Sequence, residues 1–176
     1  CMIKKDIFNK VGKFDEDFGI LGEETLLSWR IWLIGYRVIF NPYARGIHYF
    51  GTRFKTVEKY YTNKRIFFNG PKNYISMLIQ CLETENLCKI LPIHVTIWFF
   101  SGCAMIFTGK LNQGINIFKG LIYVLGNISN ILRKRSVVQE RRKLTDKELF
   151  KTILQNPPRN YYRQRLLRYI TLGLHG

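Results

Sequence analysis

The run Ile90–Thr108 contains no charged side chain, and it constrains the fold more than any other stretch of the chain. A helix needs about 20 apolar residues to cross a bilayer, so this run is just long enough to span one. Pro92 and Gly102 weaken a spanning helix, whereas Lys89 and Lys110 bracket the run as interfacial anchors do. The chain must therefore place these residues in a membrane or in the core of a helical domain.

A second apolar segment, 115–132, follows closely. Its apolar residues recur at helical spacing, namely Ile115, Phe118, Leu121, Ile122, Leu125, Ile128 and Leu132. Arg133-Lys134-Arg135 comes directly after it, and such a cluster is typical of a cytoplasmic face. The two segments predict an apolar helical hairpin, residues 89–135, at the cytoplasmic face of the cell membrane. Insertion in the membrane plane is favoured over spanning, and a buried helical core is the alternative.

The formal net charge of +16 is unevenly spread. Segment 133–176 contains twelve Lys or Arg residues and three Asp or Glu residues. Within it, residues 159–170 interleave cations with tyrosine and leucine, which predicts that the basic tail 136–176 attaches to an anionic membrane surface. Nucleic acid is the competing partner, but the chain contains no RNA-binding or zinc-finger signature.

Two adjacent carboxylates, Glu23 and Glu24, follow Gly22 and precede an apolar run that ends at Gly35. This pattern predicts a short helix with acids in its first turn and a glycine stop. A helix N-terminus favours an anionic carboxylate by about 0.3 to 1 kcal/mol, and an anionic carboxylate can accept a proton. An extended segment after the helix can cover the same distance back, so His48 can lie near Glu24.

Five pieces of the N-terminal third resemble, in order and spacing, the family 2 glycosyltransferases, especially their rhamnosyltransferase-like branch. The pieces are Gly12-Lys13-Phe14-Asp15-Glu16-Asp17-Phe18, Gly22-Glu23-Glu24-Thr25-Leu26-Leu27-Ser28-Trp29-Arg30, Ile34-Gly35-Tyr36-Arg37, Asn41-Pro42 and His48. The resemblance covers Cys1 to about Phe54. It implies an α/β fold, in which residues 1–56 form the C-terminal part of a Rossmann-like GT-A catalytic domain. Linking helices in 57–88 would then lead to the membrane-associated helical region.

The resemblance also implies roles for individual residues. Glu24 takes the place of the general base that removes the acceptor proton, and Glu23 that of the acid before it. His48 takes the place of a ligand to a divalent magnesium or manganese ion. Two positions depart from the family pattern, because Glu24 is usually aspartate and Leu26 replaces a second acid often found there.

Four further residues are candidate substrate contacts. Gly22 would let the chain pass close to a bound ligand. Arg53 and Lys55 would meet the diphosphate, or else are simply solvated. Asp15 belongs to Asp15-Glu16-Asp17, which matches an Asp-x-Asp metal motif as a string, although a polar turn is the better interpretation.

These features together predict a fragment of an inverting glycosyltransferase. It would transfer a sugar from a nucleotide-sugar donor to a saccharide or polyprenyl-linked acceptor in cell-surface glycan synthesis. The chain lacks an initiating methionine and the nucleotide-binding half of the family, which predicts a fragment inactive alone. The alternative is a non-catalytic basic module that binds membranes or nucleic acid.

Local signals predict the remaining elements. A helix over Lys5–Val11 closes at Gly12, and a helical stretch from Val57 to Leu82 is interrupted at Asn69-Gly70-Pro71. Thr145 and Glu148 have the spacing of a capping box that starts a helix through Leu154. Arg30 is expected to fix its helix through an ion pair. The cysteines, which show no pairing pattern, are predicted to be reduced thiols, namely Cys1, Cys81, Cys88 and Cys103.

Overall fold

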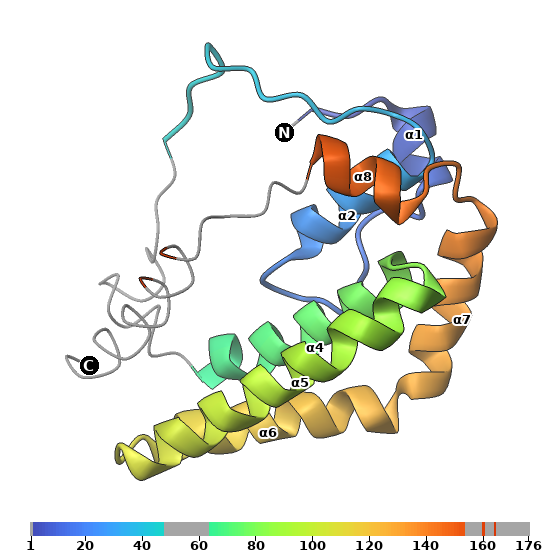
Figure 1. The fold of residues 1–176 in the computed structure, drawn as a ribbon. Helices are drawn as coiled ribbons and strands as arrows, with labels where there is room; N and C mark the ends of the chain where they lie inside the picture. The colour runs from blue at the N-terminus through green and yellow to red at the C-terminus, as the bar shows by residue number, and fades with distance from the viewer. Residues whose placement is uncertain (1, 48–63, 154–159, 161–163, 165–176) are drawn as a thin grey trace.

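The fold of the chain is a bundle of helices (Figure 1). A computed structural model describes residues 2–47, 64–153, 160 and 164. The elements in these residues are α1 (Lys5–Lys10), α2 (Glu23–Leu33), α4 (Lys64–Cys81), α5 (Thr84–Phe107), α6 (Leu111–Gly126), α7 (Ile128–Glu140) and α8 (Asp146–Thr152). The described residues are 70% helical and contain no strand. The expectation of an α/β, Rossmann-like fold is therefore wrong.

The segment after α2 shows why no sheet forms in the described part of the chain. Residues Tyr36–Phe40 form no regular element, and no described segment pairs with them as a strand. Their apolar side chains are exposed, including Phe40 at 86%. A strand satisfies its backbone N–H and C=O groups only by pairing with another strand, so an apolar and β-branched sequence by itself does not produce a sheet.

The first two helices end as their glycines predict. At the end of α2, Gly35 has a φ of 86°, its N–H donates to the Trp32 carbonyl at 2.9 Å, and the Tyr36 N–H donates to the Ile31 carbonyl at 3.1 Å. This is the Schellman arrangement, which satisfies the last carbonyls of a helix. Gly12, with a φ of 85°, ends α1 in the same way, so both predicted helices are confirmed.

Helix α4 occupies the centre of the bundle and packs against α2, α5, α6 and α7 (Figure 1). It continues through Gly70-Pro71, so the predicted interruption there is wrong. A proline inside a helix removes one backbone hydrogen bond, and the loss must be offset by packing. Here Pro71 lies against α6 at Gly120, where an added Cβ would come within 2.9 Å of the Pro71 ring and 2.4 Å of the Phe68 carbonyl oxygen.

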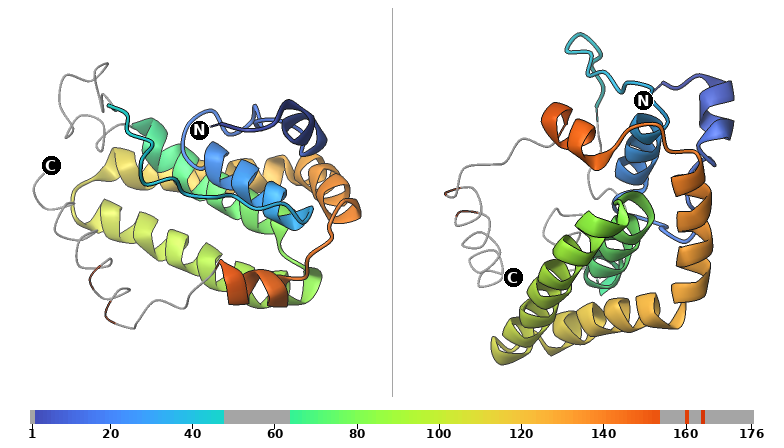
Figure 2. Two further views of the ribbon diagram at one scale, coloured as in Figure 1. Left: turned by 90° about the horizontal axis from the view of Figure 1, so that it is seen from above. Right: turned by 45° about the vertical axis from the view of Figure 1, so that its right-hand side comes forward.

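Helices α5 and α6 form an antiparallel hairpin that extends away from α2 and α8 (Figures 1 and 2). Their closest approach is made by glycines. A Cβ added to Gly114 would lie 2.7 Å from the carbonyl oxygen of Gly102, and one added to Gly102 would lie 2.8 Å from the Phe118 ring. The predicted single segment 115–132 is divided, because α6 and α7 meet at Asn127 with a bend of 67°.

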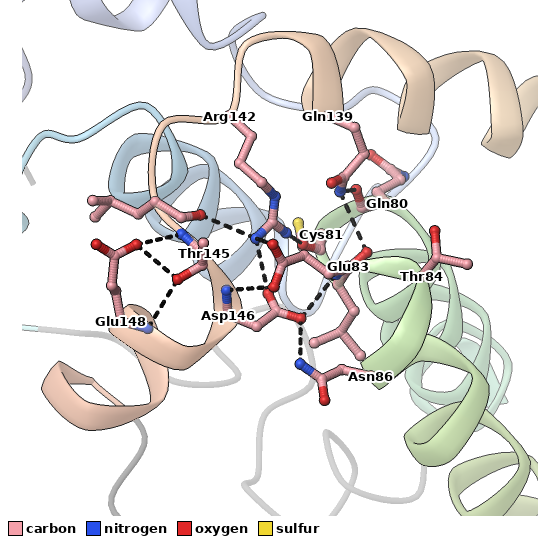
Figure 3. Close-up of polar contacts among 12 residues, drawn as sticks. Gln80, Cys81, Glu83, Thr84, Asn86, Gln139, Arg142, Thr145, Asp146 and Glu148 are labelled. Carbon is pink, nitrogen blue, oxygen red and sulfur yellow. Dashed lines mark hydrogen bonds and ion pairs between the residues drawn. The ribbon is translucent and has the colours of Figure 1, made fainter.

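Helix α8 begins with the predicted capping box, which the structure confirms. The Glu148 N–H donates to the Thr145 hydroxyl at 3.3 Å, and the Thr145 N–H donates to the Glu148 carboxylate at 2.7 Å. The next residue, Asp146, is fully buried and connects α8 to the start of α5 (Figure 3). It accepts hydrogen bonds from the Glu83 N–H at 2.8 Å, the Asn86 amide at 3.0 Å and the Arg142 guanidinium at 2.9 Å.

Candidate functional site

The acidic pair opens α2. Glu24 is exposed in the first turn, whereas Glu23 is partly buried. Gly22, directly before them, has a φ of 81°, a conformation that glycine adopts at little cost. Leu21 has a φ of 72°, which costs a residue with a side chain roughly 1 to 2 kcal/mol. A strained residue persists only where its surroundings fix it, so the approach to Glu23 and Glu24 must be held from outside.

Two buried side chains of α4 hold that approach. The Asn73 amide donates to the carbonyl oxygens of Phe18 at 3.0 Å, Ile20 at 2.9 Å and Leu21 at 2.7 Å. The ammonium of the preceding residue, Lys72, donates to the Asp17 carbonyl oxygen at 2.5 Å. The loop 15–22 therefore follows a fixed path over α4 into the first turn of α2, and Glu24 stands at the end of it.

The predicted substrate contact Asp15 lies inside the bundle, where it is 7% exposed. Its carboxylate accepts from the Arg30 guanidinium at 3.0 Å and also contacts the ammonium of Lys134. Arg30 in turn donates to the Gln80 amide oxygen at 2.6 Å. The predicted ion pair of Arg30 is thereby confirmed, and this environment fits an Asp15 that positions the loop from within.

Asp15-Glu16-Asp17 forms a polar turn, which was the preferred of the two interpretations of this sequence. The Asp17 N–H donates to the Asp15 carboxylate at 3.2 Å. The Asp17 side chain faces outward and pairs with Lys134 at 2.6 Å and with the Asn130 amide at 3.0 Å. The hydrogen bond from Lys134 holds the pKa of Asp17 below its ordinary value, against the opposing effect of burial.

The two carboxylates of the pair have different environments. Burial raises the pKa of Glu23, and the neighbouring Glu24 raises it further. One oxygen of Glu23 is buried and has no hydrogen-bond partner among the described residues. Glu24 is instead exposed to solvent in the first turn of the helix. The carboxylate of Glu24 is thus the one of the two that an incoming molecule can reach.

A small cavity lies beneath the loop, lined in part by Asp17, Asn73, Tyr123 and Lys134. Its volume is about 10 Å³, which is room for roughly one water molecule. Lys72 borders it, with its ammonium 5.3 Å from the centre of the Phe68 ring and 5.2 Å from that of Tyr123. Burial lowers the pKa of Lys72. This cavity supports the loop and is too small for a sugar.

Three predicted site residues, His48, Arg53 and Lys55, lie outside the described residues. Within the described ranges, no three His, Cys, Asp or Glu side chains are grouped so that they could hold a metal ion. The cysteines there differ in environment: Cys81 is buried, with its pKa raised to about 12 by burial, whereas Cys88 is exposed.

Sequence reasoning did not identify Asn73, Lys72 or Lys134, which hold the loop. Their sequence signal is weak, since Lys72-Asn73 is merely a polar pair on an apolar helix. The comparisons with known proteins add no further residue. No family model, curated protein or solved structure matches this chain. The likeness to glycosyltransferases thus rests on the five motifs alone.

Proposed function

We propose that this chain is the acceptor-side part of an inverting, nucleotide-sugar-dependent glycosyltransferase, with Glu24 as its general base. The observation that carries the proposal is the placement of Glu24. Its exposed carboxylate follows two positive-φ residues, the strained Leu21 and Gly22, and the buried Asn73 amide fixes their path. Strain retained beside an exposed acid is typical of catalytic sites more than of helix starts in general.

The chemistry requires one base and one leaving group. Glu24 would take the proton of an acceptor hydroxyl as the oxygen attacks the anomeric carbon of the donor. The bond between that carbon and the nucleoside diphosphate would break at the same time, so that the configuration inverts. A fixed loop supports this step, because a base that is held in place contributes more than one that must first be ordered.

The donor site is proposed to lie outside the described residues, which contain no nucleotide-binding sheet. His48 remains the proposed ligand of a magnesium or manganese ion, and such an ion would neutralise charge on the departing diphosphate. Arg53 and Lys55 remain proposed contacts of that diphosphate, and Gly22 of the acceptor. We further propose a saccharide or polyprenyl-linked acceptor at the cytoplasmic face of the membrane, since the basic excess of the chain suits an anionic lipid surface.

The test is a sugar-transfer assay on a polypeptide that contains both this sequence and a nucleotide-binding domain. Glu24→Gln is expected to lower turnover by about 10²- to 10⁴-fold, the usual contribution of a general base, while nucleotide-sugar binding persists. Glu24→Asp, which restores the acid usual in the family, should keep much of the activity. Glu16→Gln is the matched control, since it removes an exposed carboxylate from the loop that leads to Glu24. Equal turnover in Glu24→Gln and Glu16→Gln would refute the assignment.

The second candidate is a non-catalytic, basic module that binds a membrane. The exposed apolar surface of α5 favours it, because that surface exists whether or not Glu24 is a base. This candidate would be supported if the chain binds membranes and Glu24→Gln leaves the rate of sugar transfer unchanged. Tight and strongly salt-dependent binding to nucleic acid would instead support the nucleic-acid form of the module.

A further inference from the structure

Helix α5 has the length and composition of a membrane helix but is not the core of this fold. It is 24 residues long, and 6% of its most apolar window is buried. The part of α5 from Pro92 onward carries no charge, and its exposed large apolar side chains are Ile93, Val95, Ile97, Phe99, Phe100 and Phe107. A soluble helix buries such a face, so this one needs a covering partner.

The exposed side of α6 is divided lengthwise into two edges. The edge beside α5 is apolar and consists of Leu111, Ile115, Ile122 and Leu125. The other edge is polar and consists of the exposed Asn112 and Lys119 and the partly buried Asn116. The contacts of α6 fix these directions, because Phe118 packs on α5 at Gly102 and Phe99, whereas Tyr123 faces Phe68 and Lys72 of α4.

From this division we infer that the α5–α6 hairpin lies in the plane of an anionic bilayer surface and does not span it. The outer face of α5 and the apolar edge of α6 enter the lipid together, and the polar edge faces water. A spanning hairpin would instead expose the polar edge to hydrocarbon over roughly 10 Å of α6, including the charge of Lys119. This inference does not depend on sugar transfer.

The charge of the chain favours an anionic bilayer, and not a second copy of the protein, as the partner that covers this apolar surface. The chain carries +16, so two copies would repel each other, whereas anionic lipid would attract either one. Cations border the apolar surface at both ends of the hairpin: exposed Lys89 stands near the start of α5, and Lys110 stands at the turn between the helices. Arg133 is exposed on α7 directly after the exposed Leu132.

Flotation of the full chain with vesicles tests the surface. Vesicles of phosphatidylcholine with about one quarter phosphatidylglycerol should bind it, and vesicles of phosphatidylcholine alone should bind it less. Ile122→Glu and Phe100→Glu, both at exposed positions, should each lower the partition coefficient by about tenfold or more. Asn116→Glu is the matched control, since it adds the same charge on the polar edge of α6, and it should change binding by less than about twofold.

If Ile122→Glu and Asn116→Glu lower vesicle binding equally, the division of α6 into an apolar and a polar edge is refuted. The loss would then be a general effect of the added negative charge. A stable dimer in solution that does not float with vesicles would assign the surface to a second copy and overturn the lipid partner. Far-UV circular dichroism of each variant shows whether the helices persist, so a loss of binding can be separated from unfolding.

Cysteine labelling separates an in-plane hairpin from a spanning one. The background is Cys1→Ser, Cys88→Ser and Cys103→Ala, with the buried Cys81 retained because its raised pKa keeps it unreactive. In vesicle-bound protein, a maleimide that cannot cross the membrane should label Asn116→Cys and leave Ile122→Cys protected. Protection of both positions would mean that α6 spans the bilayer and would refute the in-plane arrangement. Labelling of both would mean that α6 lies outside the lipid altogether.

Discussion

The loop 15–22 with α2 and the α5–α6 hairpin are held in opposite ways. The loop is fixed by polar side chains that reach it from α4 and α7, namely the buried Lys72 and Asn73 and the partly exposed Lys134. Away from the start of α5, where Asn86 donates to the buried Asp146, the hairpin is held by close glycine contacts and aromatic packing. Directional bonds fix a path to within tenths of an ångström, whereas apolar packing mainly fixes a surface. The hydrogen-bonded loop suits the chemistry proposed for Glu24, and the apolar hairpin suits the proposed attachment to a membrane.

Asp146 joins α8 to the start of the hairpin, and removing it should have the largest effect. Asp146→Ala takes away the acceptor for Glu83, Asn86 and Arg142 and leaves the Arg142 guanidinium poorly compensated in a buried place. We expect a loss of about 3 to 5 kcal/mol in the free energy of unfolding, measured by guanidinium denaturation. Asp146→Asn, which keeps one acceptor oxygen, should lose less. A loss below about 1 kcal/mol in Asp146→Ala would show that the packing of α8 on the start of α5 does not depend on these contacts.

The glycine at the contact of α6 with α4 gives the next largest effect. Gly120→Ala places a Cβ 2.4 Å from the Phe68 carbonyl oxygen, and backbone atoms cannot move aside as a flexible side chain can. Alanine favours a helix over glycine by about 1 kcal/mol, but overpacking costs about 1 to 3 kcal/mol and should outweigh it.

Gly126 near the end of the same helix supplies the control. An added Cβ there meets nothing within 4 Å, so Gly126→Ala should be neutral or slightly stabilising. Thermal unfolding followed by circular dichroism compares the two variants. If Gly120→Ala melts at or above the temperature of Gly126→Ala, the close approach of α6 to α4 does not exist in solution.

The elements that sequence could predict are those with local signals. The glycine stops of α1 and α2 and the capping box of α8 involve residues within five positions of each other, so the pattern alone was enough. The apolar character of α5 was equally plain. The sequence could predict that Arg30 forms an ion pair, because a buried arginine needs a partner. It could not predict that this partner is Asp15.

What sequence could not predict depends on distant partners. The Asn73 clamp joins residues 52 to 55 positions apart, and nothing in a polar pair on an apolar helix indicates which loop it holds. The helix through Pro71 persists because Gly120 lets α6 pack against it. The β-branched run after α2 looked like a strand, yet a strand exists only where a second one lies beside it. Tertiary context decided all three cases.

Asn73→Ala tests the clamp on the loop. The substitution removes the shared donor of three carbonyls and should lower the free energy of unfolding by about 2 to 3 kcal/mol. The sharper measurement is hydrogen exchange, because amides of residues 15–22 should lose protection while those of α5 and α6 keep theirs. Asn73→Asp, which has the same shape but offers no N–H to these carbonyls, should behave similarly. Uniform loss of protection in both regions would mean that the clamp is part of the general core and has no special relation to the loop.

Asp17→Asn should have the smallest effect and tests whether the outer ion pair adds to the clamp. The Asp17 side chain is 43% exposed, so its pair with Lys134 is screened by solvent and is expected to contribute less than about 0.5 kcal/mol. Its pKa is lowered below the ordinary 3.8, so the folded state favours the ionised form. The contribution is therefore present above that value and is lost as the pH falls through the lowered pKa. The difference between wild type and Asp17→Asn in the free energy of unfolding should close as the pH falls below 3.8, and at neutral pH it should shrink as salt is added. A difference that persists at low pH and high salt would assign the effect to the hydrogen bond from Asn130, in which case the loop is held by directional bonds on its outer side as well.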